Sequence, residues 1–323
     1  MAAKNSKNIP FIDVNHLQRK SIKYKETVQK IKAACVNPGF FCLNNLPKNE
    51  KKLLNTAKSH MDDFFSLEDS NPIKQEINTT GSKNSYGWMP MFQEPAYKAG
   101  TLAHVESFDF GRKSKKVESP NHNNNRWPKI VNFKKDIRST WDEYTNLGRL
   151  SLNAINDGLG LPEKFLTKNC ASQDLSTMRL LNYPPVDVSL INEDNVGISA
   201  HTDFECITLI SQTAPGLEVM GSDNKWHKAS NDDKQIMVIF GKMLEIWTNG
   251  HIKATKHRVQ NREWQRYSIV MFFSANDNLI IEPLDQFVKD GNKKYPAIKQ
   301  REHIDNEIKK AIENRDNLVN SKK

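Results

Sequence analysis

The 323-residue chain has little cysteine and no long apolar run. Its four cysteines are scattered without CxxC spacing, which argues against a cysteine zinc site and a disulfide framework and suits a reducing compartment. No stretch approaches the roughly 18 apolar residues of a membrane span, and the first residues, MAAKNSKNIPFIDVNHL, lack the apolar run of a signal peptide. We therefore expect a cytoplasmic protein without a membrane as partner.

Aromatic residues are missing from the basic segments. The net charge is +9, and the densest basic run is GRKSKKVES at 111–119. It lacks the interleaved aromatics of a surface that stacks nucleic-acid bases. We interpret this run as a solvated loop, with a localisation or anion-binding patch as the alternative, and expect no nucleic acid as partner. A basic protein also favours acidic small molecules.

Apolar residues make up 37% of the chain, enough for one large core. Periodicity near 3.6 predicts helices at YKETVQKIKAAC, EKKLLNTAKSHMDDFFSL, 134–158 and REHIDNEIKKAIENRDNL. Strands are expected at IPFIDV and GFFCLNN, and loops at SYGWMPMFQEP and NHNNNRWP. From about residue 174 short apolar strands alternate with turns such as APG and TNG, the pattern of a sandwich or barrel.

The segment ISAHTDFECITLI, residues 198–210, is apolar and β-branched yet contains His201 and Asp203. Residues two apart on a strand point to the same side, so these side chains form a two-ligand clamp. In an isolated HxD the commoner interpretation is a hydrogen-bonded core histidine beside a turn acid. A third imidazole, His257 in LEIWTNGHIKATKHRV, favours a metal site if its strand pairs with that of His201. Two histidines and one carboxylate leave three coordination positions open, as in non-haem Fe(II) sites, whereas zinc more typically takes three histidines or cysteines.

Two further strands carry polar side chains on one face. In NREWQRYSIVMFF, Arg266 and Ser268 are two apart and form a receptor for a carboxylate; an exposed edge arginine is hard to reconcile with the apolar SIVMFF. In STMRLLNYPPV, Arg179, Leu181 and Tyr183 share a face by the same parity. Tyr183 offers a phenol and Arg179 a cation to a bound acid, unless Arg179 pairs with a surface acid.

Together these motifs resemble the isopenicillin N synthase-like branch of the Fe(II)/2-oxoglutarate-dependent dioxygenases. IPFIDV, GFFCLNN, ESFDFG and NRWP look like its N-terminal landmarks, and NYPP, HTDFECITLI, GLEV, LEIWTNGHIKATKHRV and RYS look like its catalytic core. Each is weak alone, but their order and spacing over almost the whole chain are specific. The resemblance implies a mainly β fold with flanking helices (α+β) around a distorted double-stranded β-helix, or jelly roll.

The resemblance also implies roles for individual residues. It implies that the iron ligands are His201, Asp203 and His257. It implies that the distal carboxylate of 2-oxoglutarate is bound by Tyr183, Arg266 and Ser268. It places along the substrate pocket Arg179, Phe272, Tyr86 and Trp88, the last two in a wall or lid.

Along the chain we expect four segments of one monomer. They are an N-terminal mixed helical and strand region at 1–130, a long supporting helix at 131–173, the jelly-roll core at 174–285 and a C-terminal helix at 286–323.

The reaction implied by the resemblance consumes O2 and 2-oxoglutarate and releases succinate and CO2. It would hydroxylate, desaturate or cyclise a small metabolite of a biosynthetic pathway. The basic chain and Arg179 favour a carboxylate-bearing substrate, with kainoid-type amino-acid cyclases as one candidate group. The alternatives are an oxidase of the same fold that uses Fe(II) and O2 without 2-oxoglutarate, a non-catalytic jelly roll that binds a small acid, and a nucleic-acid demethylase.

Overall fold

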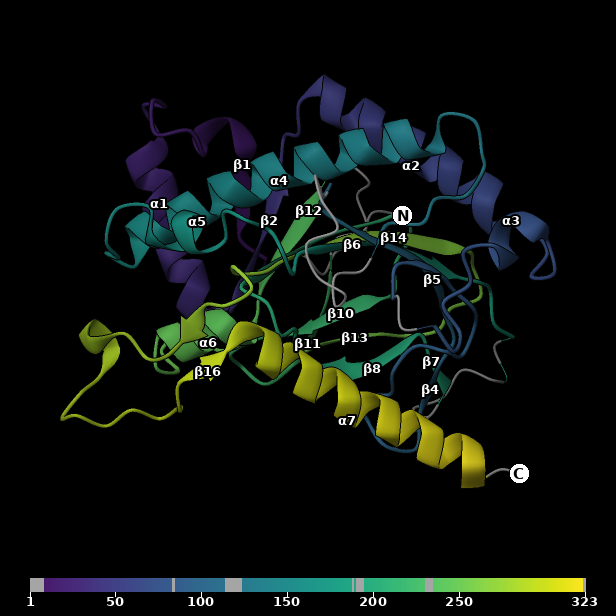
Figure 1. Ribbon diagram of the computed structural model, residues 1–323. Helices are drawn as coiled ribbons and strands as arrows, with labels where there is room; N and C mark the ends of the chain where they lie inside the picture. The colour runs from purple at the N-terminus through teal and green to yellow at the C-terminus, as the bar shows by residue number, and fades with distance from the viewer. Residues whose placement is uncertain are drawn as a thin grey trace.

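Two β-sheets packed face to face form the centre of the molecule, with helices outside them (Figure 1). The structure is a computed structural model and describes residues 9–82, 85–113, 124–187, 189, 195–229 and 235–321. The expected α+β class with a jelly-roll core is confirmed.

The strands come from both halves of the chain. In sheet order, the larger sheet is β1 (Phe11–Asp13), β2 (Phe40–Asn44), β12 (Ile236–Phe240), β9 (Ile207–Gln212), β14 (Arg266–Phe273), β6 (Thr177–Tyr183), β5 (Glu106–Gly111) and β3 (Gly87–Met89). The smaller sheet is β11 (Trp226–Lys228), β10 (Leu217–Met220), β13 (His257–Val259) and β8 (Ile198–His201). Two short pairs join β4 (Leu102–Ala103) to β7 (Asn195–Val196) and β15 (Ile280–Ile281) to β16 (Ile298–Lys299). Strands from the first 130 residues thus share one sheet with the segment at 174–285.

The helices cover the outer faces. They are α1 (Tyr24–Val36), α2 (Lys48–Phe65), α3 (Pro72–Gln75), α4 (Phe133–Gly158), α5 (Phe165–Asn169), α6 (Lys242–Trp247) and α7 (Gln300–Ser321), with short 3₁₀ turns at Val14–His16 and Asp285–Phe287. In Figure 1, α1, α2, α4 and α5 lie over the larger sheet, and α7 crosses the molecule below it along the smaller sheet. None of the helices in the described part of the chain is long and apolar enough to cross a bilayer.

Alternation along the central strands separates two apolar cores. Phe41 and Leu43 of β2 point into the core beneath the helices, whereas Phe40 and Cys42 point into the core between the sheets. All five residues of β12, IMVIF, are buried because both faces of the larger sheet are covered. The sheet is therefore held from both sides, and side chains at alternate positions reach the space between the sheets.

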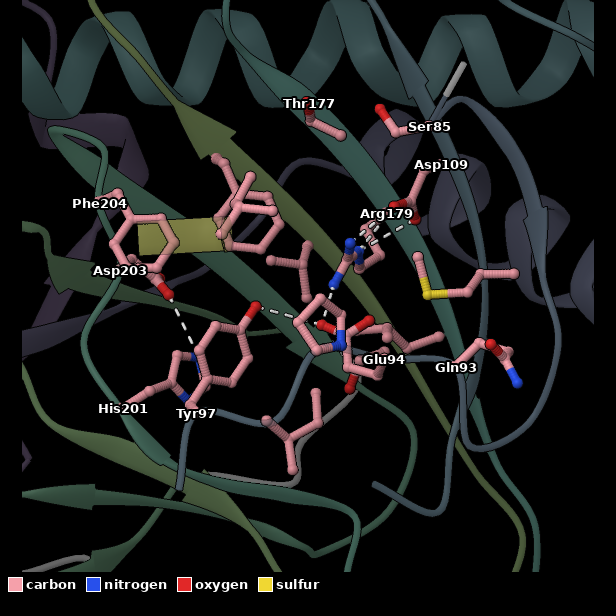
Figure 2. A pocket seen from close by; sticks show the side chains of 18 of the residues that line it. Ser85, Gln93, Glu94, Tyr97, Asp109, Thr177, Arg179, His201, Asp203 and Phe204 are labelled. Carbon is pink, nitrogen blue, oxygen red and sulfur yellow. Dashed lines mark hydrogen bonds and ion pairs between the residues drawn. The ribbon is translucent and has the colours of Figure 1, made fainter. Parts of the chain in front are cut away.

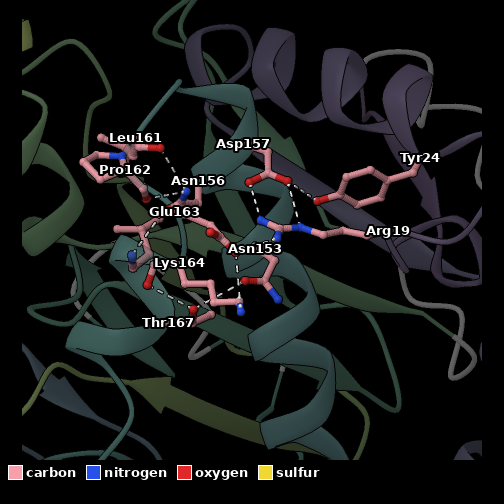
Figure 3. A network of polar contacts seen from close by, with 11 residues as sticks. Arg19, Tyr24, Asn153, Asn156, Asp157, Leu161, Pro162, Glu163, Lys164 and Thr167 are labelled. Atoms are coloured by element: carbon pink, nitrogen blue, oxygen red, sulfur yellow. Dashed lines mark hydrogen bonds and ion pairs between the residues drawn. The ribbon is translucent and has the colours of Figure 1, made fainter.

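A polar network fixes α1 and α5 to the end of α4 (Figure 3). Asp157 accepts two hydrogen bonds from the Arg19 guanidinium at 3.1 and 2.7 Å and one from the Tyr24 hydroxyl at 2.7 Å. Beside it, Asn156 accepts from the backbone N–H of Leu166 at 3.1 Å and donates to the Pro162 carbonyl at 3.1 Å. The charge-assisted bonds to Asp157 and the neutral bonds of Asn156 together fix α1 and α5 against the end of α4.

The sequence predicted the four longest helices but not the short helices α3, α5 and α6, and it predicted a loop where a strand lies. The predicted helix at 134–158 corresponds to α4, and the predicted C-terminal helix lies within α7. SYGWMPMFQEP was predicted to be a loop, but Gly87–Met89 form β3 and pair with β5. The basic run at 111–119 lies mostly outside the described residues.

Candidate active site

A cavity of about 460 Å³ lies between the two sheets. Alternate residues of β6 and β14 form its floor, β8 and β13 form the opposite wall, and α7 closes one side. Because neighbouring inward-facing residues are two apart, each strand contributes a row of side chains to this space. Figure 2 shows part of this lining.

Three side chains meet at one end of the cavity. His201 and His257 are direct partners in the antiparallel pair of β8 and β13, and Asp203 follows two residues after His201. One ligand atom from each side chain lies within 4.8 Å of the others. The Nε2 atoms of both histidines are 3.5 Å from Asp203 Oδ1. This spacing suits three donors around one cation.

Backbone contacts orient the two imidazoles. His201 Nδ1 lies 2.8 Å from the Ser199 carbonyl, and His257 Nδ1 lies 3.1 Å from the Thr255 carbonyl. A carbonyl accepts only from a protonated nitrogen, so each Nδ1 carries the proton and each Nε2 presents its lone pair to the site. The Thr208 hydroxyl donates to Asp203 Oδ2 and leaves Oδ1 facing the histidines.

The protonation states also suit a metal. Burial alone raises the pKa of Asp203, but the nearby His257 and the contact with His201 outweigh it and lower the pKa to about 2. Burial lowers the pKa of His257 to about 4. Near neutral pH the carboxylate is therefore charged and the His257 imidazole is neutral, the forms that bind a cation. Burial, with Asp203 nearby, raises the pKa of the adjacent Glu205 to about 8.

Two buried donors without partners lie on β14. Arg266 Nε and Nη2 donate to Gln212 Oε1 at 3.2 and 2.9 Å, and the guanidinium lies 4.5 Å from the centre of the Tyr183 ring. Arg266 Nη1 and Ser268 Oγ are buried, line the cavity and have no hydrogen-bond partner. No carboxylate in the described segments forms an ion pair with Arg266. A buried cation with a free N–H beside a free hydroxyl fits the carboxylate of a bound acid.

A second charged group lies on the neighbouring strand β6, on the same floor of the cavity. Arg179 donates to both carboxylate oxygens of Asp109 at 2.7 to 3.0 Å and to Glu94 Oε1 at 2.6 Å (Figure 2). Burial alone lowers the pKa of Arg179, but the two carboxylates raise it well above its usual value. Burial raises the pKa of Asp109, and the charge of Arg179 opposes that shift. The Tyr97 ring stacks on His201 with ring centres 4.3 Å apart.

The cavity collects nearly all the side chains predicted from the sequence. They are Tyr86, Arg179, Tyr183, His201, Asp203, His257, Arg266, Ser268 and Phe272. Trp88 was predicted to line the pocket, and this is wrong. It is 1% exposed, and its indole N–H donates to Glu106 Oε2 at 2.6 Å within the core. A buried indole needs such an acceptor, and the carboxylate on neighbouring β5 provides it.

Sequence reasoning missed Glu94, Tyr97, Asp109 and Glu205, which also line the cavity. For Asp109 a signal existed, because a carboxylate inside the apolar strand ESFDFG needs a buried partner. Its strand partner is Arg179. For Glu94 and Tyr97, in the irregular segment after β3, no periodicity was available.

Two family models match most of the chain. The model described as the 2OG-Fe(II) oxygenase superfamily matches residues 175–275, and the model described as the N-terminal region of non-haem dioxygenases in morphine synthesis matches residues 9–130. The first match contains the His-Asp-His cluster and both unpartnered donors of β14.

Individual relatives agree with these matches. A 2-oxoglutarate-Fe(II) type oxidoreductase of Metarhizium rileyi is 32% identical over 259 residues, covering 73% of this chain and 72% of the relative. A homoarginine-6-hydroxylase of Glycine max is 26% identical over 327 residues, covering 93% and 96%. The crystal structure of a full-length Neurospora crassa protein in complex with alpha-KG superposes with a TM-score of 0.80 at 25% identity, covering 95% of this chain and 97% of that one.

Proposed function

Since the chain belongs to the 2OG-Fe(II) oxygenase superfamily, and is thus an oxygenase dependent on Fe(II), 2-oxoglutarate and O2, we propose that His201, Asp203 and His257 hold its iron. The observation that carries this assignment is their convergence within 4.8 Å, with both Nε2 atoms facing one carboxylate oxygen. Three positions around an ion held there stay free for 2-oxoglutarate and O2.

The distal carboxylate of 2-oxoglutarate is assigned to Arg266 and Ser268. Within the described cavity lining, Arg266 Nη1 and Ser268 Oγ are the buried donors left without partners, and Gln212 fixes the guanidinium from the other side. The Tyr183 ring supports the same guanidinium from its face. This arrangement supports 2-oxoglutarate rather than a substrate carboxylate as the ligand of β14, in line with the relatives' names.

Bound iron, with 2-oxoglutarate and O2, supplies the oxidant that attacks a carbon–hydrogen bond of the substrate, and succinate and CO2 are the products. The chain itself positions the reactants. The strand pair β8–β13 aims two lone pairs at one point, β14 holds the cosubstrate's far end, and α7 lines one side of the cavity.

The substrate is a small molecule, and we propose hydroxylation as the reaction. The name of the Glycine max relative, a homoarginine-6-hydroxylase, supports this choice. The predicted acidic substrate depended on the basic net charge of the chain and on Arg179 as a cation offered to the substrate. Its contacts with Asp109 and Glu94 do not support that role, since both carboxylates already occupy the guanidinium.

Turnover of the purified protein tests this function. With Fe(II), ascorbate, 2-oxoglutarate and a panel of small metabolites, we expect one succinate per oxidised substrate and a product with one added oxygen atom in its mass spectrum. Loss of two hydrogen atoms would instead indicate desaturation or ring closure. Succinate formation at the rate of a sample without Fe(II) would contradict the proposal.

Gly216 gives Arg266 the room it needs. A Cβ at Gly216 would lie 2.9 Å from Arg266 Cδ and 3.0 Å from Nε. Gly216→Ala is therefore expected to displace the guanidinium and raise the KM for 2-oxoglutarate by about tenfold, a cost of about 1.4 kcal/mol. Iron content should stay at the parent level. Gly158→Ala is the control, because its Cβ would meet only Lys32 and Val28 far from the cavity; equal KM values in both variants would contradict the assignment.

A further inference from the structure

We propose that the cavity wall formed by Glu94, Asp109 and Arg179 is a receptor for a positively charged nitrogen of the substrate, with Glu94 Oε2 as the acceptor. The inference rests on the proposed function, because it concerns the molecule oxidised at the same iron site. It names the substrate class: an amine or guanidine that carries its cationic group at a distance from the oxidised carbon.

The first support is an unused carboxylate oxygen. Glu94 is 1% exposed, and its Oε1 accepts from Arg179 Nη1 at 2.6 Å and from the Tyr97 hydroxyl at 3.2 Å. Its Oε2 is buried and has no hydrogen-bond partner, although Glu94 lines the cavity. A buried acceptor without a partner costs about 1–3 kcal/mol. A donor from a ligand would remove that cost.

The second support is the charge balance. One guanidinium, Arg179, faces two carboxylates, and its bidentate contact is with Asp109. Glu94 receives only a single N–H from it. With both carboxylates ionised, one negative charge is left in excess inside the protein, where uncompensated charge is costly. A ligand with one positive charge would neutralise it, whereas an anionic ligand would add to it.

No protein cation in the described part of the cavity is free to do so. Arg315 of α7 donates to the Gln93 carbonyl at 2.6 Å and to Asp316. Arg266 lies at the cosubstrate end and donates to Gln212. The other acidic residues of the described lining are Asp203, a proposed iron ligand, and Glu205, and neither can neutralise Glu94. Within the described lining, no cation complements Glu94, and we assign that role to the ligand.

Tyr97 connects this receptor to the iron site (Figure 2). Its ring stacks on the His201 imidazole at an interplanar angle of 13°, and its hydroxyl donates to Glu94 Oε1. The carboxylate therefore lies at the far end of a tyrosine ring whose face covers an iron ligand. A molecule held by its cation at Glu94 would extend along Tyr97, with Phe272 also in the lining, and bring a more distant carbon toward the iron.

Helix α7 holds this wall in place. The Ala96 N–H donates to the Ala311 carbonyl at 2.9 Å, and Asn314 Nδ2 donates to the Ala96 carbonyl at 3.2 Å. The short segment that carries Glu94 and Tyr97 is thus anchored on α7 before any ligand binds. Such preorganisation lowers the entropic cost of binding.

Paired probes test the proposal. L-lysine and L-arginine are each compared with a counterpart of similar size and no net charge, respectively L-norleucine and L-citrulline; L-glutamate is the acidic member. Binding to the anaerobic protein loaded with Fe(II) and 2-oxoglutarate is followed by the change in the iron absorption spectrum and by calorimetry. We expect at least one cationic probe to bind ten times or more tightly than its neutral counterpart, and L-glutamate not to bind.

Glu94→Gln keeps the shape of the side chain but presents an amide without charge. It should reduce the cationic-to-neutral affinity ratio about tenfold or more, whereas Glu94→Asp, which keeps the charge, should retain part of it. Glu302→Gln on the exposed side of α7 is the control for loss of one acidic charge and should leave the ratio unchanged. Equal binding within both pairs, or an unchanged ratio in Glu94→Gln, would overturn the receptor. Uncoupled conversion of 2-oxoglutarate to succinate by the parent separates the two hypotheses, since it stands or falls with the proposed function alone.

Discussion

His257→Ala is expected to abolish turnover and to weaken Fe(II) binding by more than about 100-fold, because even indirect partners of metal ligands cost 10- to 100-fold when removed. The variant loses one of three donors and leaves Asp203 buried beside a single imidazole. Burial holds the pKa of His257 near 4, so the wild-type ring is neutral and needs no deprotonation to bind metal at neutral pH. The variant therefore loses a nitrogen lone pair that is free to bind the metal at neutral pH.

Iron bound per chain after anaerobic loading and desalting measures this effect directly. Thermal melting with and without Fe(II) gives a second measure, since a ligand stabilises only the form that binds it. His227→Ala is a matched control. Both histidines lie opposite Val219 on β10, one on each side, but His227 contacts Asp223 outside the cavity. Full iron content in His257→Ala, or equal loss in His227→Ala, would refute the assignment of the iron ligands.

Strand parity explains why so much of the cavity could be predicted from the sequence. Once β6 and β14 are recognised as strands, Arg179 and Tyr183, or Arg266 and Ser268, must share a face whatever lies around them. The iron cluster needed one more assumption, that the strand of His257 pairs with that of His201, and this pairing is confirmed. The family resemblance supplied the chemistry of the ligands.

Partners distant in sequence could not be predicted in this way. Arg179 was predicted to offer a cation to a bound acid, with pairing to a surface acid as the alternative. Asp109 and Glu94 lie 70 and 85 residues before it and meet it only in the folded chain. The alternation of the strand determines the direction in which the Arg179 side chain points but not the residues that it contacts. The contacts with Asp109 and Glu94 then changed the proposed charge of the substrate from negative to positive. The prediction that Trp88 lines the pocket was wrong for a similar reason, because the acceptor of its indole N–H, Glu106, lies on another strand.

Arg266→Met is expected to raise the KM for 2-oxoglutarate by about 10²-fold to a few thousand-fold, the cost of about 3–5 kcal/mol for removing one partner of a buried ion pair. Methionine keeps much of the apolar stem against Tyr183 but offers no N–H to the distal carboxylate. Ser268→Ala removes one neutral donor, so its KM should rise less, by about threefold to tenfold. Arg262→Met is the control, because Arg262 pairs with Glu218 and does not line the cavity.

A cosubstrate without the distal charge separates recognition from folding. 2-Oxopentanoate keeps the keto acid that chelates iron but ends in a methyl group. In the parent it should be much poorer than 2-oxoglutarate, because Arg266 would remain buried without an anion. In Arg266→Met the preference should fall to near unity, because neither end group finds a charged partner. A general loss of folding would lower the use of both keto acids and leave their ratio intact, so a preserved preference would place the carboxylate receptor elsewhere.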